Sequence, residues 1–217
     1  MKPPKPRLNE SQRAWVRDWW RALQPLAEGE APPQGELARL GRGARAQLRR
    51  CRQAGALLVQ PAVFALAHGL IERSHERLAD APLTYERLAW VAAVLACIKN
   101  DTQDGRSLAW HLGRAAGGER EAMSERRFKA MLRCTSLSEL CTHWRRAVQL
   151  LADGTADVAR LADDLLAWQF DLEHGRPRAS DGIRFHWAFD YYLNAKEQGE
   201  AALALSADTA STEENHP

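Results

Sequence analysis

The chain has 217 residues, of which 45% are hydrophobic and 27% charged, with 30 basic and 28 acidic side chains. This composition is typical of a soluble globular protein and excludes a disordered one. No apolar run approaches the roughly 20 residues that cross a bilayer, and the first ten residues lack an apolar signal core, so we expect a cytoplasmic protein.

The order of elements predicts an all-α protein. Between Pro25 and Pro177, breakers separate segments rich in Ala, Leu and Arg, which favour helix, and no segment alternates as a strand does. We expect a compact helical bundle of about eight to nine helices with a basic face. We assign residues 1–205 to a single domain, with a division into two helical lobes near 100–106 as the alternative. Residues 206–217 are expected to form a disordered acidic tail.

The first informative element is a helix expected over 37–52. Its apolar residues share one side and its arginines the other. Between Glu36 and Glu72 the chain has six arginines and no acid. Like charges along a helix repel, so a solvated helix usually mixes charges. Either acids elsewhere in the fold pair with this side or it binds a polyanion, which we favour. These arginines are Arg39, Arg42, Arg45, Arg49, Arg50 and Arg52.

A second basic helix is expected over 124–133, "SERRFKAMLR". Ser124 is a suitable cap, and Phe128, Met131 and Leu132 take the core side. The basic side chains lie away from the core: Arg126, Arg127, Lys129 and Arg133.

A third helix, expected over 137–153, has apolar residues at steps of three and four. Ser136 and Glu139 predict a capping box at its start. Arg145 and Arg146 add to the positive charge of the preceding helices.

Acids gather further along the chain, where residues 150–175 hold six acids and one arginine. Such charge segregation is the electrostatic footprint expected of a protein that binds a phosphate backbone. We interpret Asp163 and Asp164, with Asp171 and Glu173, as a solvent-exposed acidic face and not as a metal-binding carboxylate set.

Other residues give no sign of an enzyme. The four cysteines lack C-x-x-C spacing and are expected to be buried, reduced thiols. His111, His143 and His186 stand alone in the sequence, and no phosphate loop or nucleophile motif occurs. The eight tryptophans lie at apolar helix positions, which favours core packing. We therefore expect no catalytic residue, no metal and no cofactor.

The segment 181–196 is apolar on most of its circumference and should be buried on two sides. It is either a central helix of one domain or a helix with one side against a second subunit.

The ordered segments "RAQLRR", "PAVFALA", "SLAWHLGRA", "SERRFKAMLR", "LSELCTHWRRAVQLL", "VARLADDLLAWQ" and "RFHWAFDYY" resemble the CasB small subunit of the type I-E CRISPR surveillance complex, Cascade. The resemblance runs from about residue 12 to 193. The proline-rich loop at 28–35 and the tail after 193 depart from the family pattern, so no role is assigned to them.

This resemblance implies an all-helical protein without a catalytic centre, which packs as a head-to-tail pair inside Cascade. Its implied partners are the guide RNA, the target and non-target DNA strands, other Cascade subunits and a second copy of itself, with no membrane. The implied role is to stabilise the guide RNA–target heteroduplex and the displaced strand. The alternative is a structural helical adaptor whose basic face binds an acidic protein.

The matching motifs assign the phosphate contacts to basic side chains of three helices. We expect these side chains to lie opposite the apolar stripes, so that replacing them with alanine weakens nucleic-acid binding and leaves folding intact. The residues assigned by motif are Arg45, Arg49, Arg50, Arg126, Arg127, Arg133, Arg145 and Arg146. To these we add Arg42 from the same basic face, with Lys129 and Arg184 as weaker candidates.

Overall fold

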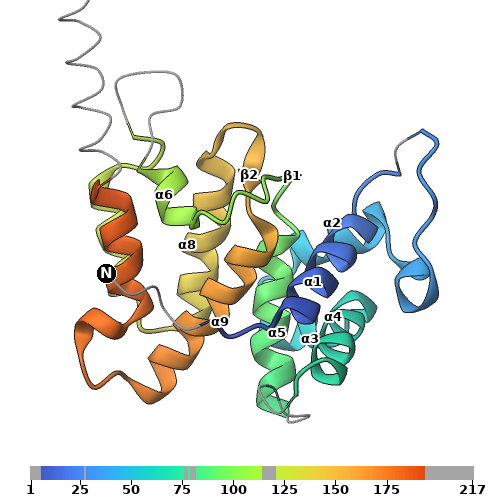
Figure 1. Cartoon of the computed structure of the whole chain (residues 1–217), viewed down its shortest axis with the longest axis horizontal. Helices are drawn as coiled ribbons and strands as arrows, with labels where there is room; N and C mark the ends of the chain where they lie inside the picture. The colour runs from blue at the N-terminus through green and yellow to red at the C-terminus, as the bar shows by residue number, and fades with distance from the viewer. Residues whose placement is uncertain (1–5, 27, 76–77, 79–81, 114–120, 194–217) are drawn as a thin grey trace, which may run out of the picture.

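The computed structural model describes residues 6–26, 28–75, 78, 82–113 and 121–193. These residues form ten α-helices, which confirms the predicted mostly helical class (Figure 1). Within the described ranges, no helix combines the length and apolar character needed to cross a membrane. The helices are α1 (Glu10–Ala22), α2 (Arg42–Arg50), α3 (Ala54–Leu58), α4 (Pro61–Glu72), α5 (Pro82–Leu95), α6 (Leu108–Leu112), α7 (Glu125–Arg133), α8 (Leu137–Leu150), α9 (Val158–His174) and a last helix over 183–193.

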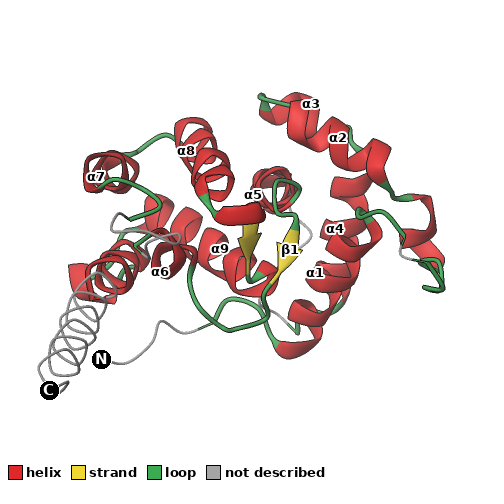
Figure 2. Ribbon diagram, turned by 90° about the horizontal axis from the view of Figure 1, so that it is seen from above, coloured by secondary structure: helices red, strands yellow, loops and turns green. Residues whose placement is uncertain are grey.

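Helix α5 lies between α1 and α4 on one side and α8 and α9 on the other (Figures 1 and 2). It packs against α2, α3, α4, α8 and α9. Every residue from Leu88 to Ile98 is buried, as expected of a helix that is apolar all round. One cluster of buried side chains extends from Leu8 to Tyr191. The domain over 1–205 and its alternative division stay predictions, and the tail at 206–217 lies outside the described residues.

Two short strands accompany the helices. β1 (Asn100–Asp101) pairs in parallel with β2 (Thr155–Ala156). Two-residue strands carry no alternating pattern, so the sequence could not reveal them. They bring the end of α5 close to the start of α9, where the Asp101 carboxylate accepts a hydrogen bond from the Val158 amide at 2.9 Å.

The predicted helix over 37–52 is wrong in its extent. The chain makes a 3₁₀ turn over Gly35–Arg39, is extended at Leu40, and only then begins α2. Gly41 and Gly43 stand at this break, and glycine has a low helix propensity. The arginine-rich half of the predicted helix is therefore a separate short helix.

The interpretation of the acids in α9 as a solvent-exposed face is wrong for Asp163 and Asp164, whereas Asp171 is half-buried and Glu173 is exposed. Asp163 and Asp164 are 6% and 1% exposed. The Asp163 carboxylate accepts hydrogen bonds from the amides of Arg7 and Leu8 at 2.7 and 2.6 Å, and Asp164 accepts one from the Trp187 indole at 2.9 Å. The chain before α1 and the last helix cover α9 on two sides, so these acids fix neighbouring segments to it.

The last helix is buried on one side only. Ile183, Trp187 and Tyr191 are at most 3% exposed, whereas the opposite side is open. The interpretation as a central helix buried on two sides is therefore wrong for the described residues. Contact with a second subunit stays a prediction for this exposed apolar side, which comprises Phe185, Phe189, Tyr192 and Leu193.

The expectation that tryptophans pack in the core is confirmed for six of the eight. Three of them form a row of edge-to-face rings across three helices. The ring centroids of Trp144 and Trp168 are 5.6 Å apart, and those of Trp168 and Trp187 are 4.8 Å apart. Such pairs add about 0.5–1.5 kcal/mol each beyond the area they bury, so this row joins α8, α9 and the last helix.

Candidate nucleic-acid interface

Helix α2 presents an exposed row of arginines. Leu48 is the buried residue of this nine-residue helix, whereas Arg42, Arg49 and Arg50 are exposed, as is Arg52 just after its end. No carboxylate among the described residues lies within ion-pair distance of these four guanidinium groups. Their mutual repulsion is therefore not offset by acids in the described part of the fold.

Arg45 lies on the same helix, but its side chain forms hydrogen bonds within the fold. Its half-buried guanidinium donates from Nε to the Ala96 carbonyl at 3.0 Å and from Nη2 to the Ile98 carbonyl at 2.6 Å. Burial, followed by the charge of Arg49, lowers the pKa of Arg45. Because the carbonyls just past α5 have no helical partner, Arg45 satisfies them and fixes α2 on α5.

Arg145 of α8 is buried, so the expectation that it lies opposite the apolar stripe is wrong. It is 3% exposed. Nη1 donates to the Cys51 carbonyl at 2.7 Å, and Nη2 donates to the Leu48 carbonyl at 2.8 Å. A longer bond of 3.4 Å reaches the Arg49 carbonyl. Arg145 thus caps the C-terminal end of α2, where a positive charge also suits the helix dipole.

The end of α2 and the side of α8 enclose a small pocket of about 300 Å³, which we name the arginine pocket. The buried Nε of Arg145 has no hydrogen-bond acceptor among the described residues. Several strong donors and no acid surround this space, so its chemistry suits an oxyanion such as a phosphate group. The lining residues are Ala46, Arg49, Arg50, Arg52, Cys97, Arg145 and Gln149.

Helices α7 and α8 add five further exposed cations. Phe128 and Met131 bury one side of α7. On the solvent side, Lys129 pairs with Glu125 at 2.7 Å and is thereby partly neutralised. The remaining side chains have no described carboxylate at ion-pair distance: Arg126, Arg127, Arg133 and Arg146. The weaker candidate Arg184 is half-buried, and its Nη2 donates to the Cys134 carbonyl at 2.8 Å.

Arginines near α1 and α9 behave differently, because they have carboxylate partners. Arg13 pairs with Asp163 at 3.4 Å, and Arg160 pairs with Asp164 at 2.9 Å. The acids near the end of α9 also have partners: Arg87 with Glu173 and Arg176 with Asp171. The acidic segment thus neutralises arginines of its own surroundings and leaves those of α2 and α7 unpaired.

Figure 2 shows α7, α8 and α2 along one edge of the molecule. The structure therefore brings the three predicted basic helices to the same side. Two of the ten predicted residues, Arg45 and Arg145, serve the internal contacts described above. The assignment from sequence left out Arg52, which lines the arginine pocket and which the sequence already placed on the same basic face.

The predicted reduced thiols agree with the structure, in which all four cysteines are free and all but Cys51 are buried. Burial raises the pKa of Cys97, and it raises that of Cys141 to about 11. These two thiols are therefore protonated at neutral pH and unreactive.

The fold and its charges define a mostly helical protein with two kinds of arginine. Those near α1 and α9 form ion pairs with carboxylates, whereas the exposed ones of α2, α7 and α8 have no carboxylate partner among the described residues. The chain belongs to the CRISPR-associated Cse2 family, because the model of that family matches residues 44–192, more than half of the chain. A CRISPR-associated protein Cse2 of Thermus thermophilus is 38% identical over 117 residues, which are 54% of this chain and 62% of the relative. The match thus spans less than two thirds of the relative's length.

Two solved structures share the fold. The crystal structure of CasB from Thermus thermophilus aligns with a TM-score of 0.53 and 25% identity, over 83% of this chain and 97% of that chain. A chain from the crystal structure of E. coli Cascade bound to a PAM-containing dsDNA target aligns with a TM-score of 0.52 and 18% identity, over 90% of this chain and 99% of that chain.

Proposed function

We propose that this chain is the small subunit of a Cascade-type RNA-guided complex of type I-E, working in the cytoplasm. In this role it binds phosphate backbones through the exposed arginines of α2, α7 and α8. Membership of the Cse2 family and the likeness to CasB support the assembly. The observation that carries the binding role is the set of exposed arginines without a described carboxylate partner, on helices that share one edge.

The proposed mechanism is electrostatic. Guanidinium groups hold phosphates in two-point contacts and release the counterions of the nucleic acid. Base pairing between guide and target reads the sequence, and the protein stabilises the opened strands. Because exchange of a DNA duplex for an RNA–DNA heteroduplex is nearly balanced in free energy, a few such contacts are enough to favour the open state.

The role needs no catalytic group. The carboxylates Asp163 and Asp164 are buried in contacts that hold the fold together. We expect no cleavage of DNA or RNA by the purified chain with magnesium, manganese or zinc. Specific cleavage that copurifies with the folded chain would contradict this part of the proposal.

A salt titration tests the binding role on the full chain, free and in the assembled complex. The test variants are R49A/R50A in α2 and R126A/R127A in α7. A matched control, R21A/R178A, removes two exposed arginines outside the three basic helices. Each test variant should lower the slope of log affinity against log salt by about 1.8 for duplex and about 1.4 for single strands, because two phosphate contacts are lost.

The control should leave the salt slope unchanged, and circular dichroism should report equal helix content in all variants. An unchanged slope in both folded test variants contradicts the phosphate contacts. If the wild-type chain binds no nucleic acid but retains an acidic protein partner through the same arginines, the structural-adaptor alternative holds instead.

We further propose that a second copy of the chain, present in the same complex, covers the exposed apolar side of the last helix. Phe185, Phe189 and Leu193 are 38–41% exposed there, an unusual cost for large apolar side chains. Native mass spectrometry of the assembled complex should find two copies. A single copy would contradict the pair, and F185S/F189S should lower the occupancy if this side forms the contact.

A further inference from the structure

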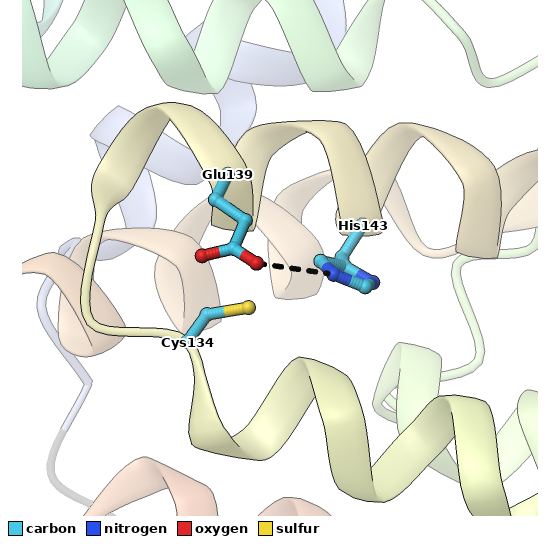
Figure 3. Close-up of side chains that lie close together, drawn as sticks. All are labelled: Cys134, Glu139 and His143. Carbon is cyan, nitrogen blue, oxygen red and sulfur yellow. Dashed lines mark ion pairs between the residues drawn. The ribbon is translucent and has the colours of Figure 1, made fainter.

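Three potential metal ligands converge at the turn between α7 and α8 (Figure 3). The Cys134 sulfur, a Glu139 carboxylate oxygen and a His143 ring nitrogen all lie within 4.8 Å of one another. The fold thus brings His143, which stands alone in the sequence, close to two other potential ligands. The His143 Nε2 lies 4.0 Å from a Glu139 oxygen, and in Figure 3 the Cys134 side chain points toward the space between the two.

Local geometry accounts for this convergence. Glu139 and His143 are four residues apart on α8, so they share one face of the helix. Ser136 occupies the cap position but makes no side-chain cap bond, so the predicted capping box with Glu139 does not form. Cys134 ends α7, and its carbonyl accepts a hydrogen bond from Arg184 at 2.8 Å, which fixes it from another helix.

We propose that Cys134, Glu139 and His143 bind a borderline divalent cation, with Zn²⁺ the best match. One sulfur, one nitrogen and one oxygen donor form a set that zinc accepts and that magnesium and calcium do not favour. Water would complete the tetrahedron as the fourth ligand. This site goes beyond the proposed function and does not depend on it.

The geometry needs only a small closure. Tetrahedral zinc holds sulfur and nitrogen ligands about 3.6 Å apart, and the three ligand atoms here already lie within 4.8 Å of one another. The Cys134 side is rigid because this residue is 4% exposed, and the Glu139 side chain is 61% exposed and therefore free to move inward. On binding, the Cys134 thiol releases its proton to solvent and the thiolate bonds to the metal.

The expected consequence is a bond between α7 and α8 at their shared turn. Both helices carry arginines assigned above to phosphate contacts, so a bound cation would restrict how they move relative to each other. The role proposed for the cation is to link these two helices, with one coordination position left to water and no reaction assigned to it.

Cobalt is the probe, because a thiolate–Co²⁺ bond gives a near-ultraviolet charge-transfer band and four-coordinate Co²⁺ gives intense visible bands. The full-length wild type should show both bands, and Zn²⁺ should remove them by displacement. C134S should lose the charge-transfer band. The matched control is C51S, which removes the half-exposed thiol outside the cluster and should keep the band.

H143Q provides a second variant that keeps the thiol. It should weaken Co²⁺ binding by at least about ten-fold. Thermal unfolding should show that Zn²⁺ raises the melting temperature of wild type and C51S but not of C134S or H143Q. A wild type without the charge-transfer band, or a band retained in folded C134S, overturns the proposal.

Discussion

Replacing Arg145 with alanine should destabilise the fold, in contrast to the expectation from sequence. The change removes two short hydrogen bonds from a buried guanidinium to the carbonyls of Leu48 and Cys51, and one long bond to that of Arg49. A hydrogen bond to a charged group contributes about 1.5–3 kcal/mol. The two short bonds therefore amount to about 3–6 kcal/mol before compensation.

Two effects reduce this magnitude. Water can enter the arginine pocket and hydrate the freed carbonyls, and the loss of one cation relieves repulsion among Arg49, Arg50 and Arg52. We therefore expect R145A to lower the free energy of unfolding by about 2–4 kcal/mol, a large part of the 5–15 kcal/mol of a typical domain. The free energy of unfolding of R145K should lie between those of wild type and R145A, because a lysine cannot donate to both carbonyls as the planar guanidinium does.

Urea unfolding followed by tryptophan fluorescence measures the change, and hydrogen exchange should show faster opening of the α2 amides. The matched control is R146A, the exposed neighbour on the same helix, which should change the free energy of unfolding by no more than about 0.5 kcal/mol. If R145A is as stable as R146A, the bonds to α2 do not hold the helix and the reasoning fails.

Two other predictions concern stability. A Cβ at Gly113 would lie 2.4 Å from the Tyr191 carbonyl oxygen, so G113A should cost about 1–3 kcal/mol in thermal unfolding, whereas G43A, whose Cβ meets nothing within 4 Å, should not destabilise. Burial raises the pKa of Asp164 to about 7. The folded state then binds a proton that the unfolded state releases near pH 4, so stability should fall as pH rises from about 4 to 7, by on the order of 2–4 kcal/mol. D164N should remove this fall, and an equal pH dependence in D164N would contradict the assignment.

Helices whose apolar residues recur at a regular helical period were predicted from the sequence, whereas contacts between elements were not. The stripe of the helix at 137–153 is present as α8, because its own residues determine which side is apolar. The break at Leu40 had a local signal in Gly41 and Gly43, whereas the hydrogen bonds from Arg45 to the end of α5 have none, because they join residues about 50 positions apart.

The buried charges could have been suspected from their spacing. Arg145 lies four residues after Cys141 and three before Val148, which places it next to the apolar stripe of α8. Asp164 lies three residues after Leu161 and four before Trp168, which places it next to the apolar stripe of α9. Their charge led us to expect exposed side chains. Burial is possible because hydrogen bonds to carbonyls and donors of other helices offset the cost of removing the charge from water.

The row of Trp144, Trp168 and Trp187 gives the protein an internal optical reporter. Edge-to-face rings with centroids 4.8–5.6 Å apart couple their electronic transitions. The near-ultraviolet circular dichroism of the folded chain therefore depends on the relative positions of all three rings. The outer two belong to α8 and the last helix, and the ring of Trp168 in α9 lies between them. Departure of the last helix would remove one ring and change this spectrum while the helix content stayed almost constant. Detachment of the last helix from α9 can thus be followed in solution without any added label.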